Sequence, residues 1–220
     1  LYLRLLRREH VPGFVRRSMY RFPQGWGTFK IDWALCGPVP WRSPEARQAA
    51  VVHAGDSVED LARFTTEVRA GKLPSHPYLV LGQQSLLDPT RAPTGHHTLY
   101  GYTHVPATLP GGWRAHRERF ADAIEERIEE LAPGFRKLIE GRCLHDPTDL
   151  ERHNENLVGG DLGGGTAAVT HQFIFRPVFP YFRYRTPVQR LYLCSSYAHP
   201  GTGVHGACGY NAALAALADN

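Results

Sequence analysis

The chain has 220 residues, 42% of them hydrophobic, and a formal net charge of +4 at pH 7, which is enough for one large or two small folded domains with an apolar core. It contains neither a secretory signal pattern nor the roughly 18 consecutive apolar residues that a membrane-spanning helix needs. We therefore expect a globular cytoplasmic protein. Peripheral attachment to a membrane stays open, and a removed N-terminus could have carried such a signal. The arginines are scattered and not clustered with aromatic residues, so we expect no nucleic-acid partner.

Cysteine usage bears on the redox compartment and on metal binding. The four cysteines are far apart and form no C-x-x-C pair, which argues against a zinc ribbon or a redox dithiol. We expect reduced, buried thiols in a reducing compartment. The positions concerned are Cys36, Cys143, Cys194 and Cys208.

The first half of the chain predicts strands and one helix after an arginine-rich amphipathic start. Residues 29–35 alternate between apolar and polar types, as a strand does, before the turn at 37–41. A helix is predicted from Asp56 to about Ala70, because an N-cap and acidic residues precede the apolar positions. Its buried face is expected to carry Leu61, Phe64 and Val68.

Further along, strands are predicted at 78–81 and 97–102. The connection at 88–93 is too proline-rich for a helix or a central strand. Asp88 and Arg91 either form an ion pair that fixes it or bind substrate, and the ion pair is favoured. A long charged helix is predicted over 113–131, where it covers the sheet. Its apolar positions are Phe120, Ile124, Ile128 and Leu131.

The composition changes near Glu155, where glycine and small residues become frequent. A short apolar strand at Leu191–Cys194, a glycine turn at 201–206 and an alanine-rich helix close the chain. We therefore predict a mixed α+β fold of two domains, residues 1–154 and 155–220.

The turn at 201–206 has the spacing G-x-G-x-x-G. A glycine turn that opens a helix presents bare N–H groups and a positive helix end to an anion, as in nucleotide-binding sites. A complete dinucleotide-binding unit also needs a second strand and an acidic residue about 20 positions later. Only fourteen residues, 207–220, follow the turn, so we expect it to complete a site whose other half lies elsewhere.

The beginning of the chain supplies no such half. It starts with Leu1, and the first hundred residues contain no second strand–turn–helix with clustered glycines. We interpret the sequence as part of a longer protein, and expect a missing N-terminal segment as its partner.

Four ordered segments, FKIDWALCGPVPW, SLLDPTRAPTGHHTLYGYTHVP, DLERHNENLVGGDLGGG and YRTPVQRLYLCSSYAHPGTGVHGACGYNAA, resemble the phytoene-desaturase-like FAD-dependent oxidoreductases. The resemblance covers nearly the whole chain and is greatest to the pyridine-nucleotide-disulphide oxidoreductase domain-containing branch. It implies a partial substrate-binding domain at 1–154 and a return into the FAD-binding domain at 155–220, without the N-terminal Rossmann motif. FAD is expected in the intact protein but not in this chain alone.

The same resemblance implies that the final glycine turn lies beside the flavin. The expected cofactor-binding residues are Ser195, Gly201, Gly203, Val204, His205 and Gly206. Two departures are Cys36, where the family usually carries aspartate, and Tyr197-Ala198. The first puts in doubt a polar role at that strand end, and the second leaves the shape over the flavin uncertain.

Two histidines flank the terminal glycines and are weak candidates for catalysis. Either His199 or His205 could carry a proton near neutral pH, but a histidine in a turn more often serves as a hydrogen-bonding loop residue. Their roles stay open, and the catalytic residues are unknown. A metal site formed with Cys208 is disfavoured, so no metal is expected.

Other aromatic and histidine positions also have two interpretations. His96 and His97 are neighbours in a strand and point to opposite faces, so with His104 we interpret them as structural. Trp33, Trp41 and Tyr102 either line an apolar substrate cavity or belong to the core, and the core is favoured.

Two functional hypotheses follow. The first is an oxidoreductase portion that, in the intact protein, transfers hydride between an apolar substrate and FAD; this chain alone is expected to be inactive. The second is a non-catalytic protein-interaction module derived from the same fold. A homo-oligomer is left open in either case.

Overall fold

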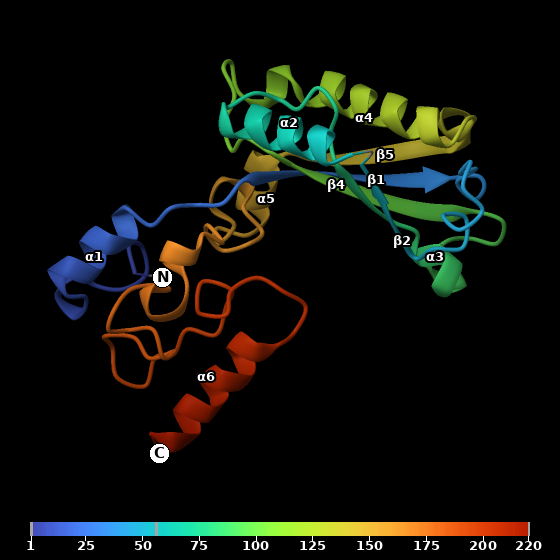
Figure 1. The fold of residues 1–220 in the computed structure, drawn as a ribbon. Coiled ribbons are helices and arrows are strands. Elements are labelled where there is room, and N and C mark those ends of the chain that lie inside the picture. The colour runs from blue at the N-terminus through green and yellow to red at the C-terminus, as the bar shows by residue number, and fades with distance from the viewer. Residues whose placement is uncertain (1, 56, 220) are drawn as a thin grey trace. The chain divides into compact units, whose positions relative to one another are not determined.

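A computed structural model describes residues 2–55 and 57–219 (Figure 1). Asp56, proposed above as the start of a helix, lies outside the described residues. The chain divides into two compact units, one of Trp26–Glu155 and one in which Leu1–Gly25 joins Asn156–Asn220. We call them the sheet unit and the loop unit, and describe each by itself.

The sheet unit is built on five antiparallel strands in the order β2-β3-β4-β1-β5. The longest strands, β1 and β4, pair at the centre over nine positions, from Gly27↔Val105 to Leu35↔His97. The bounds are β1 Gly27–Leu35, β2 Val51–Ala54, β3 Leu79–Gly82, β4 His97–Val105 and β5 Ile139–His145.

Two helices, α2 (Val58–Arg69) and α4 (Arg117–Leu131), lie on the same side of this sheet (Figure 1). The alternation in β1 explains the packing, because every second side chain points toward the helices. Four of them are at most 2% exposed: Phe29, Ile31, Trp33 and Leu35. Aromatic rings extend this core, since Phe29 contacts Trp113 and Phe120 at 5.5 and 5.1 Å between ring centroids.

A buried polar link ties α4 to two strands. The indole nitrogen of Trp33 donates to Glu125 Oε1 at 2.9 Å, and Arg142 Nη1 in β5 donates to the same oxygen at 3.0 Å. Burial alone would lower the pKa of Arg142, but its hydrogen bonds to Asp122, Glu125 and Glu118 outweigh this effect and raise it. The carboxylate of Glu125 is thus buried with two donors, which a stable packed site requires.

Short elements complete the sheet unit. They are the helices α3 (Gln84–Leu87) and α5 (Pro147–His153) and the 3₁₀ turns Pro89–Arg91, Trp113–Ala115 and Phe135–Leu138.

The mixed α+β fold class is confirmed. The strands predicted at 29–35, 78–81 and 97–102 are also confirmed, with ends that differ from the prediction by at most three residues. Of the helix face expected for α2, Phe64 and Val68 are buried, but Leu61 is 46% exposed, so that prediction is wrong. The stripe that reaches the core is narrower than expected, and Leu61 falls at its edge. The Asp88–Arg91 pair is confirmed, with Arg91 Nε donating to Asp88 Oδ2 at 3.0 Å.

The long helix starts later than expected, because a 3₁₀ turn at Trp113–Ala115 precedes α4. Its positions Phe120, Ile124 and Ile128 are buried as expected, and Leu131 is partly buried. Trp33 and Trp41 are core residues, at 2% exposure each. Tyr102 lies on the opposite face of the sheet, where it is half-buried.

The loop unit has two α-helices among its described residues, α1 (Gly13–Tyr20) and α6 (Ala207–Ala218), joined by loops and short 3₁₀ turns. Its small core contains Tyr2, Val11, Val15 and Val178. The 3₁₀ turns lie at Arg8–His10, Val158–Gly160, Val169–His171 and Phe173–Phe175.

The prediction of a strand at Leu191–Cys194 is wrong. Within the described part of the chain, this segment forms an isolated bridge, in which Tyr192 pairs with Arg185. Two backbone bonds, from Thr186 N to Leu191 O at 3.1 Å and from Leu193 N to Tyr184 O at 2.7 Å, hold the segment together with side-chain bonds. Asp219 accepts from Tyr192 Oη at 2.9 Å and from Arg185 Nη2 at 2.7 Å.

The cysteine prediction is half correct. The described cysteines are free thiols, but Cys36, Cys143 and Cys194 are exposed and Cys208 alone among them is buried. Cys36 follows the end of β1, Cys143 lies in β5 and Cys194 lies in a loop. No described helix is long and apolar enough to cross a bilayer.

Contacts group residues 2–25 with the C-terminal part and not with the sheet. Backbone bonds show why, since Thr166 N donates to Pro23 O at 2.9 Å. The assignment of 1–154 to substrate binding and 155–220 to FAD binding stays a prediction.

Candidate functional site: a glycine-lined loop cluster

The terminal glycine turn opens α6 with no side chain at its cap. Gly206 is the N-cap residue, in a left-handed conformation with φ 63° and ψ 1°, and no side chain caps the helix there. Gly201 and Gly203 also have positive φ, 91° and 156°. A side chain in any of these conformations would be strained, so the turn depends on its glycines.

Of the other expected cofactor-binding residues, Val204 and His205 lie on this turn and Ser195 lies before it. Val204 is fully exposed. His205 turns its ring back, so that its Nδ1 accepts from the N–H of Ala207 at 2.9 Å. Ser195 lies exposed at the start of the segment, where its Oγ accepts from the N–H of Tyr197 at 3.4 Å. Their contact with a cofactor stays a prediction.

His199 is held by a different loop. Its Nδ1 accepts from the N–H of Phe173 at 3.2 Å, and the two rings lie 4.9 Å apart. Tyr184 Oη donates to the His199 carbonyl at 2.7 Å. Both weak catalytic candidates therefore use one ring nitrogen in a backbone bond, which leaves Nε2 of each as the atom that could carry a proton.

Arg176 is the residue that sequence reasoning missed. It is 1% exposed and donates five hydrogen bonds to four backbone carbonyls. Nε and Nη2 reach Ser196 O at 2.9 and 2.7 Å, Nη1 reaches Thr166 O at 2.9 Å, and Nη2 also reaches Gly164 O at 2.8 Å and Gly163 O at 3.3 Å. One side chain thus fixes the 163–166 loop and the approach to the terminal turn.

Asp161 performs the complementary task with backbone N–H groups. It is 3% exposed and accepts from Gly25 N at 2.6 Å, from Gly163 N at 2.7 Å and from Gly165 N at 2.7 Å. Burial lowers the pKa of Arg176, and the negative charge of Asp161 opposes that shift. The two buried, oppositely charged side chains thus both bind the backbone of the glycine loop, Asp161 through N–H groups and Arg176 through carbonyls.

The two glycine segments meet directly. Thr202 Oγ1 donates to Gly163 O at 2.6 Å, and a Cβ on Gly164 would lie 3.1 Å from the backbone of Tyr197. The thiol of Cys208 donates to the carbonyls of Ala198 and Gly201, at 3.6 Å each. The sequence showed the 163–165 glycines as a change in composition, but it held no signal that an arginine eleven or more positions away would bind them.

The donor chemistry of this cluster fits an anionic group of a cofactor. The first N–H groups of any α-helix lack intrahelical partners. At the start of α6 the N-cap residue Gly206 has no side chain to offer them, and His205 Nδ1 accepts from one of them, the N–H of Ala207. A negative charge there is favoured by about 0.3–1 kcal/mol, and by up to about 2 when partly buried. No set of three or more His, Cys, Asp or Glu residues among those described could hold a metal ion.

The histidines of the sheet unit are held in separate contacts. His97 Nδ1 lies 3.2 Å from Ser85 Oγ, whereas His96 Nε2 lies 3.4 Å from Glu140. The ring of His104 packs edge-on against Trp26 and Tyr102.

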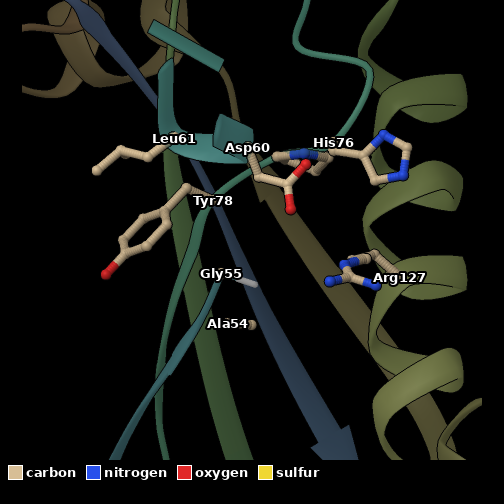
Figure 2. A pocket seen from close by; sticks show the side chains of 8 residues that line it. Ala54, Gly55, Asp60, Leu61, His76, Tyr78 and Arg127 are labelled. Atoms are coloured by element: carbon tan, nitrogen blue, oxygen red, sulfur yellow. The ribbon is translucent and has the colours of Figure 1, made fainter. Parts of the chain in front are cut away.

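A small pocket opens near the end of β2, between α2 and α4 (Figure 2). Its charged side chains gather near α4, with Leu61 and Tyr78 on the other side (Figure 2). Asp60 pairs with Arg63, and Arg127 pairs with Glu130. Its empty volume of about 270 Å³, which includes open solvent, is below the usual range of ligand pockets.

Comparison with known proteins identifies relatives of this chain. The chain is 38% identical over 226 residues to pyridine nucleotide-disulfide oxidoreductase domain-containing protein 2 of Rattus norvegicus, a match over 96% of this chain and 39% of that protein. The mouse protein of the same name is 37% identical over 99% of this chain. The chain is therefore a homologue of this oxidoreductase domain-containing protein.

Two more distant relatives of this chain are carotenoid-named enzymes. One is 4,4'-diapolycopen-4-al dehydrogenase of Metabacillus indicus, 30% identical over 60% of this chain. The other is a neurosporene-forming phytoene desaturase of Cereibacter sphaeroides, 28% identical over 67% of this chain. The crystal structure of an oxidoreductase from Methanosarcina mazei shares the fold, with a TM-score of 0.55 and 14% identity over 96% of this chain and 38% of that one. No family model matches. The chain spans about 40% of the length of the rat and mouse proteins.

Proposed function

We propose that this chain supplies substrate-domain and flavin-facing parts of an FAD-dependent oxidoreductase, which transfers hydride between an apolar substrate and flavin. The names of its relatives, which include dehydrogenases and a desaturase, support redox chemistry of this kind. In the proposal, the sheet unit contributes to substrate binding and the loop unit closes the cofactor site.

The observation that carries the proposal is the glycine turn before α6, in which Gly201 and Gly203 have positive φ and the N-cap residue Gly206 has no side chain. Bare backbone lets a cofactor approach closely, and the helix end favours negative charge near it. A bound flavin would supply the acceptor for a hydride. The N–H groups of the first turn of α6 would stabilise the negative charge that this acceptor gains.

Arg176 and Asp161 act as positioning residues in this proposal. Their hydrogen bonds described above go to backbone groups, at residues 163–166 and 196 and, for Asp161, also at Gly25. Their role is to hold the glycine backbone in place before a ligand arrives, so that binding does not have to order it.

The test uses the full-length protein. We expect it to show flavin absorption at close to one flavin per chain, and we expect Gly206→Val to lose most of that flavin because a β-branched residue cannot adopt φ 63° without strain. Gly71→Val is the matched control, since Gly71 also has a positive φ of 72° but lies in the sheet unit.

A full-length protein that binds no flavin on purification or reconstitution would contradict the proposal, as would a folded Gly206→Val protein with full occupancy. The second candidate function, a protein-interaction module, rests on the outward side of α6. Its exposed apolar residues are Tyr210, Leu214 and Leu217. A full-length protein that is colourless and forms a stable complex or homo-oligomer through this face would favour it.

A further inference from the structure

The sheet face opposite α2 and α4 carries a cluster of reactive side chains that the proposed function does not use. Register places them in two cross-strand rows. Lys30 pairs with His145, and Asp32 pairs with Cys143. Because side chains two apart in a strand share a face, all four point to the same side of the sheet. Arg142, which points the other way, confirms the direction through its bonds to α4.

The contacts within this cluster centre on one nitrogen. Cys143 Sγ lies 3.5 Å from His145 Nε2, and Asp32 Oδ2 lies 3.8 Å from the same atom. Lys30 Nζ forms an ion pair with that carboxylate oxygen. A thiol beside an imidazole can pass its proton to the ring, and the neighbouring carboxylate stabilises the resulting positive charge.

The cluster is open to solvent. The side chains of Asp32 and His145 are 42% and 23% exposed, and Cys143 is exposed. Among the described residues, Cys143 is the exposed cysteine with an imidazole nitrogen at hydrogen-bonding distance; Cys36 and Cys194 are also exposed but show no such contact.

Flat aromatic surface lies in the next strand. Asp32 pairs with Tyr100 in β4, so Tyr100 and Cys143 flank it in one row, about 10 Å apart at two strand spacings. The rings of Tyr100 and Tyr102 are nearly parallel, 5° apart, with centroids separated by 6.5 Å. Lys30 Nζ lies over the Tyr100 ring, 5.8 Å from its centroid. A planar conjugated carbonyl compound that reaches from Tyr100 to the thiol would therefore pass beside this ammonium group.

We propose that Cys143 and His145 form a nucleophilic site for planar α,β-unsaturated carbonyl compounds. His145 Nε2 takes the thiol proton, and Sγ forms a bond to the β-carbon of the ligand. The electron pair of the carbon–carbon double bond moves to the α-carbon and carbonyl as an enolate. The imidazolium then returns its proton to the α-carbon, so the addition needs no oxidant or reductant. This site does not depend on the proposed flavin chemistry.

The test compares cysteines within one protein. The native chain is treated briefly with N-phenylmaleimide, a planar conjugated carbonyl compound, and labelling of each cysteine is followed by peptide mass spectrometry. We expect Cys143 to react at least about tenfold faster than Cys36 and Cys194, a modest gain for positioned proton transfer. His145→Gln should lower its rate to near that of the two reference cysteines.

His153→Gln is the matched control, because it changes a neighbouring histidine whose ring packs edge-on against His145 with 5.5 Å between ring centroids. We expect this substitution to leave the rate at Cys143 unchanged. Asp32→Asn is a second, milder variant, for which we expect a smaller decrease. Tryptophan fluorescence reports whether each variant is folded, because all four tryptophans lie in the sheet unit. Equal rates at the three exposed cysteines, or an unchanged rate at Cys143 in the folded His145 and Asp32 variants, would overturn the proposal.

Discussion

At the scale of single residues, the loop unit depends on buried charges that bind backbone. Arg176 is the clearest case, because its guanidinium is surrounded by carbonyl oxygens that have replaced water. Hydrogen bonds from a charged donor contribute more than neutral ones, about 1.5–3 kcal/mol each. Removing the donor would leave several carbonyls buried without a partner.

We therefore predict that Arg176→Met destabilises the loop unit by at least about 3 kcal/mol. Amide hydrogen exchange by mass spectrometry measures it locally, at the protected N–H groups of Gly165, Ala198 and Gly201, which should exchange faster. Arg183→Met is the control, since Arg183 is exposed in the same unit and should change stability by no more than about 0.5 kcal/mol. Equal exchange in the two variants would contradict the prediction.

At the scale of elements, α5 shows how a short helix can be fixed by its ends. Asp146 accepts from the N–H groups of Thr148 and Asp149, and Asp149 accepts from the N–H of Asp146 in return, which is a capping box. Arg117 in α4 bonds to both carboxylates. Burial alone would raise the pKa of Asp149, but the Asp146 N–H, Arg117 and Arg152 outweigh it and lower the pKa.

Asp149→Asn should destabilise the sheet unit by about 1 kcal/mol at pH 7, as for other lost caps. A carboxyl with a lowered pKa stabilises the fold above its unfolded value, here 3.8, and this contribution disappears as the pH falls through the folded pKa. Urea unfolding followed by tryptophan fluorescence should show the gap to the wild type closing below about pH 3.8. A gap that is constant from pH 7 down to pH 3 would show that charge is not the cause.

The elements of the sheet unit could be predicted because their signals are local. Alternation in β1 and the three-to-four spacing in α4 are readable from neighbouring residues, and so is the glycine turn before α6. The segment at 191–194 has the apolar residues of a strand but no partner strand among the described residues, which no local pattern reveals. Arg176 and Asp161 could not be found either, because both act on backbone far away in the sequence, where side-chain identity gives no signal.

At the scale of the whole molecule, the two units have separate cores and separate reporters. All four tryptophans, Trp26, Trp33, Trp41 and Trp113, lie in the sheet unit, which is one continuous segment with all five strands. Tryptophan fluorescence therefore reports on this unit alone.

We predict that residues 26–155 fold when produced alone, because no strand or core residue of the sheet unit lies outside this segment. Tryptophan emission and the urea midpoint should match those of the whole chain. A fragment of 156–220 should not reproduce the exchange protection at Gly165, since it lacks Gly25 and Pro23, which bond to Asp161 and Thr166. An unfolded 26–155 fragment would show that the units are interdependent.

The way Arg176 is bound has a consequence for how such loops can change over evolution. In the bonds described, its guanidinium donates to peptide oxygens and to no side-chain atom. These hydrogen bonds therefore do not depend on the side chain of the residue that supplies each oxygen. Substitutions at Thr166 or Ser196 that keep the chain path would leave these bonds intact. A lineage could thus alter the chemistry that these loops display to a ligand while inheriting their shape unchanged.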